Sequence, residues 1–242
     1  MIPRLLHPDL TPGQRTLSAE ASHHLVAVLR MRAGDRLTLF DGQGFEAGAT
    51  LTHADRQVAT VDVGEVQRVV RESPTHITVV QALCTGDKMD WVVQKATELG
   101  ARRIIPVRAA RSVLKLDANR AEKRVAHWRA IASAASAQCG RNALPNVTDV
   151  MSFTEVLADW AAQATPKTGW LLDPFTETSI SQAPMSTRVA VMNGPEAGWT
   201  DEEESLAKRS GMTGVQVGPR ILRTETVATV VLSAIAMKSG EF

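Results

Sequence analysis

The chain contains few cysteines: only Cys84 and Cys139 occur among its 242 residues. Two thiols are too few for a disulfide framework or a cysteine-based zinc site, so a reducing cytoplasm is the expected location. No apolar run approaches the roughly 20 residues that a membrane-spanning helix requires, and the first residues lack the apolar segment of a signal peptide. We therefore expect a cytoplasmic protein without membrane association, in which both cysteines are packing residues.

Several motifs that would define a nucleotide or metal site are also absent. The glycine loop at residues 194–198 is followed by no Gly-Lys-Ser/Thr, so it is not a Walker A motif, and it lacks the Gly-x-Gly-x-x-Gly pattern of a dinucleotide turn. No spacing typical of metal ligands occurs, and the sequence has neither internal repeats nor low-complexity tracts. These absences weigh against nucleoside triphosphate and NAD chemistry, and we predict no metal site.

The distribution of charge is informative although the net charge of the chain is only +1. Residues 1–73 and 146–242 have net charges of −1 and −5, whereas residues 74–145 carry 12 Lys/Arg against 5 Asp/Glu, or +7. A basic segment within a nearly neutral chain is a candidate contact surface for a polyanion such as RNA. Solvated helices also carry an excess of Lys and Arg, so charge alone leaves that alternative open.

The first part of the chain has the pattern of short β-strands. Residues 36–40, 45–51 and 58–63 alternate polar and apolar side chains, and the Asp-Gly-Gln-Gly sequence at residues 41–44 is typical of a hairpin turn between two of them. Pro74 then marks a domain boundary. We predict a small β-barrel domain over residues 1–73.

Beyond Pro74 the pattern changes to alternating strands and helices. Gly100 would end the first of the helices. Alternation of this kind indicates a mostly parallel sheet with helices on both faces, so residues 74–242 are predicted to be an α/β domain. We predict strands at residues 77–83, 103–107, 168–172, 189–193 and 214–217, and helices at residues 87–99, 119–138, 153–163, 201–210 and, mostly apolar, 227–237.

Two loops that follow predicted strands have the composition of a ligand site. Residues 194–199 come directly after a buried strand, and Thr200 and Glu203 then have the spacing of a capping box. Residues 217–226 combine a Gly-Pro corner, two arginines and a Thr-Glu-Thr cluster, in which Thr224 is a candidate N-cap. Open α/β sheets bind ligands at the carboxyl ends of their strands. We therefore predict a site here, although an ordinary loop before a well-capped helix is the alternative.

Taken together, these motifs resemble those of the bacterial ribosomal small-subunit RNA uridine-N3 methyltransferases of the SPOUT superfamily. The resemblance runs nearly from end to end, and its most specific parts are Gly-Pro-Glu at residues 194–196 and Arg-Ile-Leu-Arg-Thr-Glu-Thr at residues 220–226. The chain departs from the family at Ala197, usually glycine, at Ala137, often glutamate, and at Val217, commonly leucine. The other matches are Arg4, Pro106, Pro145 and residues 24–25, 28–30, 34–35, 41–44, 86–90, 94–100, 111–113 and 138–142.

The resemblance implies an α/β fold with a SPOUT-type parallel sheet and a C-terminal trefoil knot over residues 74–242, preceded by a PUA-like β-barrel that assists RNA binding. It also implies a homodimer and S-adenosyl-L-methionine as cofactor. The substrate would be N3 of a uridine in 16S ribosomal RNA, within the assembled or nearly assembled small subunit. By position, the residues expected to hold the cofactor are Leu172, Asp173, Asn193, Gly194, Pro195, Glu196, Gly198, Val217, Gly218, Ile221, Leu222 and Thr224.

The chemistry implied at N3 of uracil needs more than a methyl donor. This nitrogen carries a proton and becomes a competent nucleophile only when the proton leaves, so a base or a cation that stabilises the uracil anion is required. Arg223 is the leading candidate for stabilising charge on a uracil oxygen, and Glu225 could orient Arg223 or accept the proton. Both have structural alternatives, because Glu225 could cap its helix and Arg223 could pair with Glu196.

The basic middle of the chain supplies most candidates for RNA contacts. Lys and Arg side chains bind phosphates and position RNA without reading its sequence, whereas the amides of Gln138 and Asn142 could read a base edge. We expect the target uridine to be flipped or unpaired, because N3 is hidden in a base pair. The predicted RNA-binding residues are Arg4, Arg30, Lys88, Lys95, Arg108, Arg111, Gln138, Arg141 and Asn142.

Rival functions remain open from the sequence. The same fold could methylate another RNA site or a ribose hydroxyl, or the protein could be a non-catalytic RNA-binding factor for ribosome assembly. The intact cluster Arg223-Thr224-Glu225 and the two glycine loops favour an enzyme. A Rossmann-type methyltransferase is disfavoured, because residues 82–85 (Ala-Leu-Cys-Thr) provide no glycine-rich turn after the first strand of the second domain.

Overall fold

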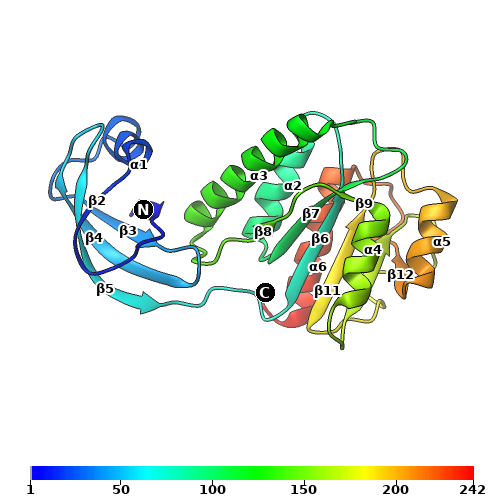
Figure 1. The fold of residues 1–242 in the computed structure, drawn as a ribbon. Helices are drawn as coiled ribbons and strands as arrows, with labels where there is room; N and C mark the ends of the chain where they lie inside the picture. The colour runs from blue at the N-terminus through cyan, green and yellow to red at the C-terminus, as the bar shows by residue number, and fades with distance from the viewer. Residues whose placement is uncertain (1) are drawn as a thin grey trace. The chain divides into compact units, whose positions relative to one another are not determined.

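The computed structural model describes residues 2–242, which form two compact units (Figure 1). The first unit combines Met1–Glu72 with Ser136–Leu144, and the second combines Ser73–Ala135 with Pro145–Phe242. The strand and helix pattern assigns residues 136–144 to the second domain, but their backbone pairs with the first unit. The Gly44 amide donates to the Asn142 carbonyl and the Leu144 amide donates to the Gly42 carbonyl, both at 3.0 Å.

A five-stranded sheet forms the first unit. Its strands, in the order β1-β3-β4-β5-β2, are β1 (Arg4–Leu6), β3 (Arg36–Phe40), β4 (Phe45–His53), β5 (Thr60–Arg68) and β2 (Gly13–Thr16). β1 is parallel to β3, and the other neighbours are antiparallel. The alternating pattern directs Leu37 and Leu39 of β3 and Val61 of β5 into one apolar core. The three strands predicted here are present.

The predicted hairpin between β3 and β4 also forms. The Asp41 carboxylate accepts hydrogen bonds from the amides of Gln43 (2.7 Å) and Phe45 (3.0 Å). Gly42 and Gly44 have φ angles of +80° and +115°, a region that favours glycine. The unit also contains α1 (Ala19–His23) and the π-helical segment η1 (His24–Val28), which the sequence pattern does not predict.

A parallel seven-stranded sheet forms the centre of the second unit. β7 pairs with both short strands β8 and β9, and the other strands follow the order β12-β10-β11-β6-β7. Its strands are β6 (His76–Ala82), β7 (Arg103–Arg108), β8 (Asn146–Val147), β9 (Met151–Ser152), β10 (Thr168–Leu172), β11 (Arg188–Asn193) and β12 (Met212–Val215). The predicted α/β fold with a parallel sheet is confirmed, with β12 two residues earlier than expected.

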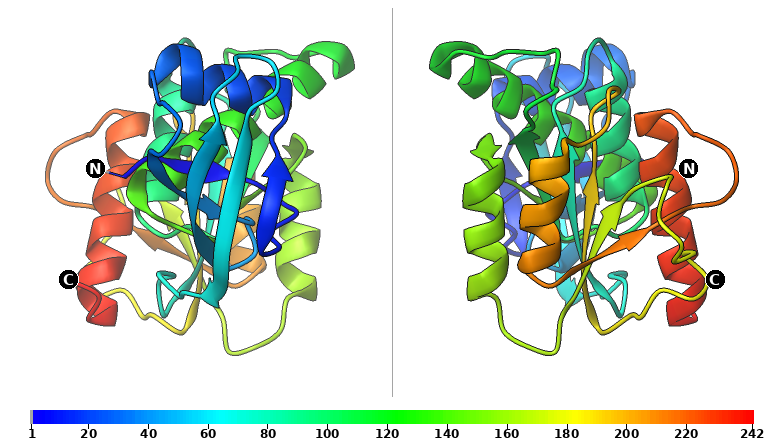
Figure 2. Two further views of the ribbon diagram at one scale, coloured as in Figure 1. Left: turned by 90° about the vertical axis from the view of Figure 1, so that its left-hand side faces the viewer. Right: turned by 90° about the vertical axis from the view of Figure 1, so that its right-hand side faces the viewer.

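Helices cover both faces of this sheet, as the alternating pattern indicates. One apolar cluster joins it to α2 (Lys88–Glu98), α3 (Ala118–Cys139) and α6 (Thr224–Ser239). The other joins it to α4 (Phe153–Ala162) and α5 (Asp201–Arg209), and Figure 2 shows α6 in red and α4 in yellow-green on opposite sides. Within residues 2–242, no helix is both long and apolar enough to cross a membrane.

Candidate cofactor pocket

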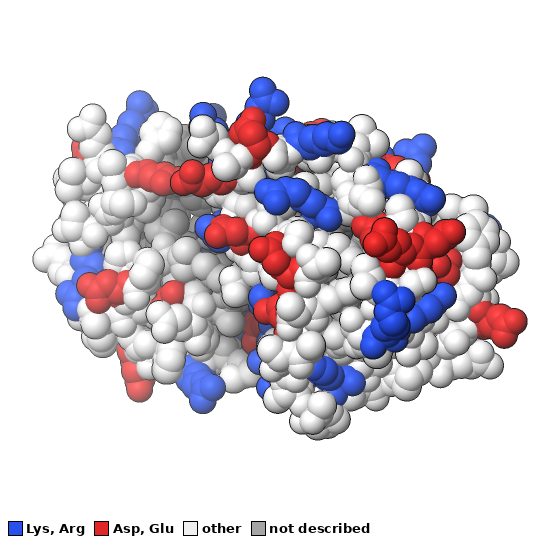
Figure 3. Space-filling view, turned by 45° about the vertical axis from the view of Figure 1, so that its right-hand side comes forward, with Lys and Arg blue, Asp and Glu red and all other residues white. Residues whose placement is uncertain are grey.

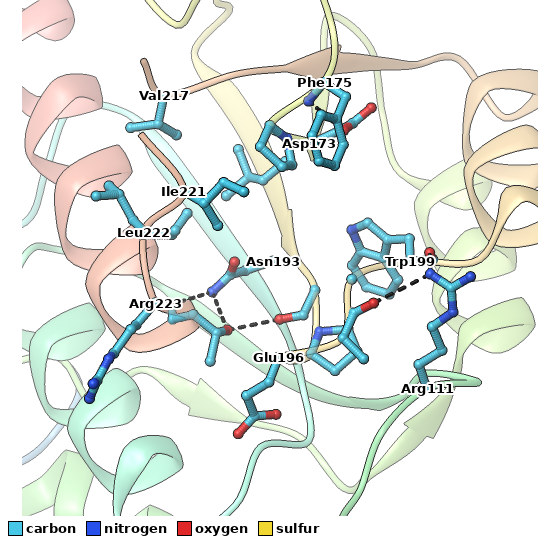
Figure 4. Close-up of a pocket in the computed structure, with 18 of the residues that line it drawn as sticks. Arg111, Asp173, Phe175, Asn193, Glu196, Trp199, Val217, Ile221, Leu222 and Arg223 are labelled. Carbon is cyan, nitrogen blue, oxygen red and sulfur yellow. Dashed lines mark hydrogen bonds between the residues drawn. The ribbon is translucent and has the colours of Figure 1, made fainter. Parts of the chain in front are cut away.

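A cavity of about 650 Å³ lies where β10, β11 and β12 end (Figure 4). Its size is typical of a small-molecule site. Three loops line it, around residues 172–175, 193–199 and 215–224. All twelve residues predicted to hold the cofactor, from Leu172 to Thr224, are among the lining residues. The structure therefore gathers into one cavity a set that the sequence distributes over more than 50 positions.

A buried polar network joins two of these loops to the sheet. The Thr224 hydroxyl donates to the Gly194 carbonyl (2.8 Å) and accepts from the side-chain amides of Gln81 (3.0 Å) and Asn193 (3.1 Å). The Asn193 amide also donates to the Gln81 side-chain oxygen and the Thr224 carbonyl, both at 2.7 Å. Strands β6 and β11 and the start of α6 are thus held together below the cavity.

This network corrects the prediction that Thr224 caps the terminal helix. Thr224 is the first residue of α6, and the N-cap is Arg223, whose side chain makes no capping hydrogen bond. The Thr224 hydroxyl cannot cap, because its donor and both acceptor positions serve Gly194, Gln81 and Asn193. Its role is to fix the loop that follows β11.

The loop at residues 194–199 packs closely on Trp199. A Cβ atom on Gly194 would lie 3.2 Å from Trp199 Nε1, so glycine allows this approach. Arg111 donates to the carbonyls of Trp199 (2.6 Å) and Ala197 (3.3 Å), which clamps the far end of the loop. Ala197 is exposed and has no positive φ angle, so its methyl group introduces no backbone strain.

The predicted capping box at the start of α5 forms and also holds a neighbouring loop. The Glu203 amide donates to the Thr200 hydroxyl (3.2 Å), and the Glu203 carboxylate accepts from the Thr200 amide (2.9 Å). The other carboxylate oxygen accepts from the Ala110 amide at 2.8 Å. Because Glu203 is buried, these bonds fix the end of the loop at residues 194–199 against the segment after β7.

The Glu196 carboxylate pairs with Lys88, which also lines the cavity, at 2.8 Å. The same carboxylate oxygen accepts from the amide (3.2 Å) and hydroxyl (3.1 Å) of Thr85. Burial raises the pKa of Glu196, but the hydrogen bonds from Lys88 and Thr85 outweigh it and bring the pKa to about 2. Within residues 2–242, Glu196 therefore pairs with Lys88 rather than with Arg223, the partner considered from the sequence.

The two predicted catalytic residues stand at the start of α6. Arg223 is exposed, and in Figure 4 its side chain extends from the rim of the cavity on the side toward which the Glu196 carboxylate points. Glu225 is half-buried, and its Oε2 atom has no hydrogen-bond partner among residues 2–242. Neither side chain is committed to a capping bond or an ion pair there. Arg223 lines the cavity, whereas Glu225 is not among its lining residues, and the catalytic roles of both stay predictions.

Cys84 lies at the end of β6 and is fully buried. Burial raises the pKa of its thiol to about 12, so the thiol is protonated at neutral pH. A protonated, inaccessible thiol is a poor nucleophile. Both cysteines were expected to be packing residues: this is confirmed for Cys84 and wrong for Cys139, which is exposed at the end of α3.

Some of the predicted RNA-binding residues have exposed side chains, whereas the side chains of others already form hydrogen bonds or ion pairs within the protein. In the first unit, Arg4 bonds to Glu46 and Asn142, and buried Arg141 pairs with Glu72. Arg30 and Gln138 are exposed. In the second unit, Arg108 is exposed, whereas Lys88, Lys95 and Arg111 bond to Glu196, Glu98 and the loop carbonyls. Within the first unit Arg4 and Asn142 contact each other, and the contacts of all nine residues with RNA stay predictions.

Sequence reasoning missed several residues that line the cavity. Trp199 and Arg111 shape the loop at residues 194–199, and Phe175 lies across the cavity from Ile221 (Figure 4). Phe175 and Ile221 are 85% and 76% exposed, unusual values for large apolar side chains. The position of Phe175 just after β10 was the available signal, because the loops after neighbouring strands meet at the same edge of the sheet.

The fold and this cavity define a class of protein. Residues 71–236 match the family described as RNA methyltransferase domain, and residues 17–63 match the family described as RNA methyltransferase PUA domain. The first match covers more than half of the chain. The protein is therefore an RNA methyltransferase family member with a PUA domain, as the resemblance of its motifs predicts.

Individual relatives narrow the assignment. Ribosomal RNA small subunit methyltransferase E of Bacillus subtilis is 37% identical over 233 residues, covering 93% of this chain and 90% of the relative. The crystal structure of the Neisseria gonorrhoeae protein of that name, bound to S-adenosylmethionine, has a TM-score of 0.92 and 34% identity, with 98% of each chain covered. A Legionella pneumophila methyltransferase solved with the same cofactor has a TM-score of 0.91, 34% identity and 98% coverage of each chain. The chain belongs to the ribosomal RNA small subunit methyltransferase E family.

Proposed function

We propose that this protein transfers the methyl group of S-adenosylmethionine to N3 of a uridine in 16S ribosomal RNA. The observation that carries the proposal is the cavity at the ends of β10, β11 and β12, which is lined by all twelve residues expected to hold the cofactor. Relatives that share a third of the sequence over almost the whole chain were crystallised with this cofactor. The reaction would take place in the cytoplasm, where ribosomal subunits are assembled.

The residues of the cavity fit S-adenosylmethionine. Its walls include apolar Leu172, Val215 and Leu222, and exposed Ile221 and Phe175 stand where an adenine ring could cover them. Gly218 has a φ angle of +140°, which leaves its backbone groups open to a ligand without a side chain in the way. An apolar slot with backbone donors and acceptors at its edge is suited to a purine.

The residues beside the cavity can supply the chemistry that N3 requires. When bound, S-adenosylmethionine provides an electrophilic methyl group on a sulfonium sulfur. Arg223 is exposed at the rim and can stabilise the negative charge that develops on a uracil oxygen as the N3 proton leaves. Glu225 has a buried oxygen without a partner among residues 2–242 and is the better candidate for the proton acceptor. Glu196 is unsuited to that role, because a carboxylate with a pKa of about 2 is a very weak base.

The finer architecture belongs to the same proposal. The second unit would be a SPOUT domain whose loops around residues 194–199 and 217–223 form a trefoil knot that holds the cofactor bent. The first unit would be a PUA-like barrel that assists RNA binding, with exposed Arg30 and Gln138 among its contacts. The protein would act as a homodimer on the assembled or nearly assembled small subunit. The match to the RNA methyltransferase PUA domain supports the role of the first unit.

The direct test is methyl transfer from labelled S-adenosylmethionine to small ribosomal subunits from a strain that lacks the endogenous activity. Nucleoside mass analysis should detect 3-methyluridine. Arg223→Ala should reduce the turnover rate about 100- to 1,000-fold, the usual effect of removing a group that stabilises developing charge. The dissociation constant for S-adenosylmethionine should stay the same, because Arg223 is assigned to the uracil.

Arg188→Ala is the matched control, because Arg188 is exposed at the start of β11, the strand end opposite to the cavity. It should transfer methyl groups at the rate of the unmodified protein. Detection of a different methylated nucleoside would replace the uridine-N3 assignment. Cofactor and RNA binding without transfer to any RNA would favour the assembly-factor function instead.

A further inference from the structure

The net charge of +7 in residues 74–145 does not produce one uniform basic surface. On the face shown in Figure 3, Lys and Arg side chains are interspersed with Asp and Glu. Many cations of the second unit are also engaged, as in the pairs Lys88–Glu196 and Lys95–Glu98. A polyanion would therefore bind most favourably where neighbouring cations have no acidic partner.

Such a place lies on the N-terminal half of α3. A cavity of about 420 Å³ there is lined by basic side chains from one face of the helix and from the segment before it. None of these cations is in the set predicted from the sequence to bind RNA. We define the α3 basic stripe as Lys115, Arg120, Lys123, Arg124 and His127, all exposed, with partly buried Leu114 and Leu116 completing the lining.

Most of the positive charge of the stripe is unpaired. Within residues 2–242, Lys115, Lys123 and Arg124 make no ion pair and no side-chain hydrogen bond. Arg120 contacts Asp117 at 3.3 Å, but both side chains are more than half exposed, so solvent weakens that pair. His127 contacts Asp90 of α2 at 2.8 Å. The stripe consequently presents at least three cations that the chain itself does not neutralise.

The arrangement is unfavourable for the helix on its own. Arg120 is three residues from Lys123 and four from Arg124, and like charges at that spacing cost about 0.2–0.5 kcal/mol per pair. The Asp117 carboxylate accepts a hydrogen bond from the Arg120 amide at 2.8 Å and caps the start of α3. Lys123 and Arg124 have no such acidic partner within residues 2–242, so an external anion would relieve the repulsion between them and Arg120.

The length of the stripe suits a nucleic acid backbone. Residues 120–127 extend about 10 Å along the helix at 1.5 Å per residue, which corresponds to roughly three nucleotides of a duplex strand at about 3.4 Å each. The stripe contains no amide side chain, and its aromatic ring, that of His127, is held by Asp90, so the stripe fits contacts that position RNA without reading sequence. Its exposed Lys and Arg side chains are of the type that binds phosphates.

We propose that the α3 basic stripe binds the phosphate backbone of the substrate RNA outside the cofactor cavity. The proposal rests on the proposed function, because it takes the substrate to be ribosomal RNA, but it concerns binding and not the methyl-transfer step. The stripe would hold a flanking RNA segment while the target nucleotide enters the cavity. It would thereby account for part of the affinity and for little of the sequence preference.

The test compares two double variants, each of which removes an adjacent Lys-Arg pair from an exposed helix position. Lys123→Gln/Arg124→Gln alters the stripe, and Lys208→Gln/Arg209→Gln, at the end of α5, is the matched control. Binding of protein-free 16S ribosomal RNA is measured at several salt concentrations. The stripe variant should bind several-fold more weakly, and the slope of log affinity against log salt should be lower in magnitude by about 1.4–1.8, for two lost phosphate contacts.

The control variant should retain the affinity and the salt slope of the unmodified protein. Affinity for S-adenosylmethionine should be unchanged in both, and thermal stability should change little, because glutamine is a good helix former and the Lys208–Glu204 pair lost in the control is long, at 3.9 Å, and solvent-exposed at Lys208. An unchanged salt slope in the stripe variant would overturn the proposal. So would a defect with whole subunits that is missing with protein-free RNA, since the partner would then be a ribosomal protein. A stripe-dependent salt slope in a protein that methylates no RNA would support the stripe and reject the proposed function.

Discussion

At the scale of single residues, the buried hydroxyl of Thr224 makes three hydrogen bonds. It donates one hydrogen bond and accepts two, all in a buried setting between β6, β11 and α6. Replacing it by valine keeps the shape of the side chain but leaves the Gly194 carbonyl and the Gln81 amide short of a partner. Buried groups without partners are costly, so the change acts on the loop at residues 194–199 and through it on the cavity.

We predict that Thr224→Val lowers the free energy of unfolding by about 1–3 kcal/mol, the cost of leaving such groups unsatisfied. It should also weaken binding of S-adenosylmethionine, because the Gly194 carbonyl loses its donor. Urea unfolding and calorimetric titration measure the two effects. Thr226→Val is the control, because Thr226 is exposed two residues further along α6. Equal losses in both variants would show that valine disturbs the helix and not the network.

At the scale of elements, α5 begins where the loop at residues 194–199 ends. Glu203 closes the capping box with Thr200 and also accepts from the Ala110 amide, so one carboxylate fixes two segments. The neighbouring Glu202 is exposed and makes no such bond within residues 2–242. Substitutions of Glu203 and Glu202 therefore distinguish the effect of the capping bonds from the effect of a negative charge at the start of the helix.

We predict that Glu203→Ala lowers the free energy of unfolding by about 1–3 kcal/mol, because the Thr200 and Ala110 amides lose their acceptor. Glu202→Ala should cost less than about 1 kcal/mol, since it loses only a favourable interaction with the helix dipole. Urea unfolding at neutral pH measures the free energy of unfolding of both variants. A loss for Glu202→Ala as large as that for Glu203→Ala would mean that charge at the first turn, and not the buried bonds, stabilises α5.

Elements with a strong periodic pattern could be predicted from the sequence. The buried strand of residues 189–193 and the capping box of Thr200 and Glu203 are examples, because local composition alone determines them. The position of Ser136–Leu144 in the first unit could not, because it depends on pairing with residues nearly 100 positions away. The same holds for Thr224, whose local sequence favours a cap while its distant partners determine its hydrogen bonds.

The candidate site likewise contains some features that the local sequence predicts and others that depend on distant residues. The glycine loops indicated which residues would meet at the strand ends, because parallel strands finish at one edge of the sheet. Their pattern gave no sign that Arg111 would clamp the loop carbonyls or that Lys88 would pair with Glu196. The sequence pattern around a charged side chain is the same whether that side chain faces solvent, a phosphate or a carbonyl, so the sequence constrains the RNA contacts less than it constrains the cavity.

At the scale of the whole molecule, each unit contains one carboxylate with a strongly lowered pKa. In the first unit, the hydrogen bond from Arg71 is the main cause that lowers the pKa of Glu46 to about 2, against the effect of burial. In the second unit, burial is outweighed by Lys88 and Thr85, and the pKa of Glu196 is also about 2. Each group binds a proton more readily when unfolded, with an ordinary value of 4.5. Both therefore contribute stability that is complete above pH 4.5 and is lost as the pH falls toward 2.

The two contributions can be measured separately, because all five tryptophans lie in the second unit. Tryptophan fluorescence during urea unfolding reports on that unit, whereas circular dichroism reports on both. Between pH 4.5 and pH 2, Glu196→Gln should reduce the pH dependence of the stability of the second unit, which fluorescence detects. Glu46→Gln should reduce the pH dependence of the stability of the first unit, which appears as the part of the dichroism change that fluorescence does not follow. At neutral pH each variant should be less stable than the unmodified protein in its own unit. If Glu46→Gln altered the fluorescence-detected transition to the same extent, the units would have to unfold together, and the stability of the cofactor pocket would depend on an ion pair in the other unit.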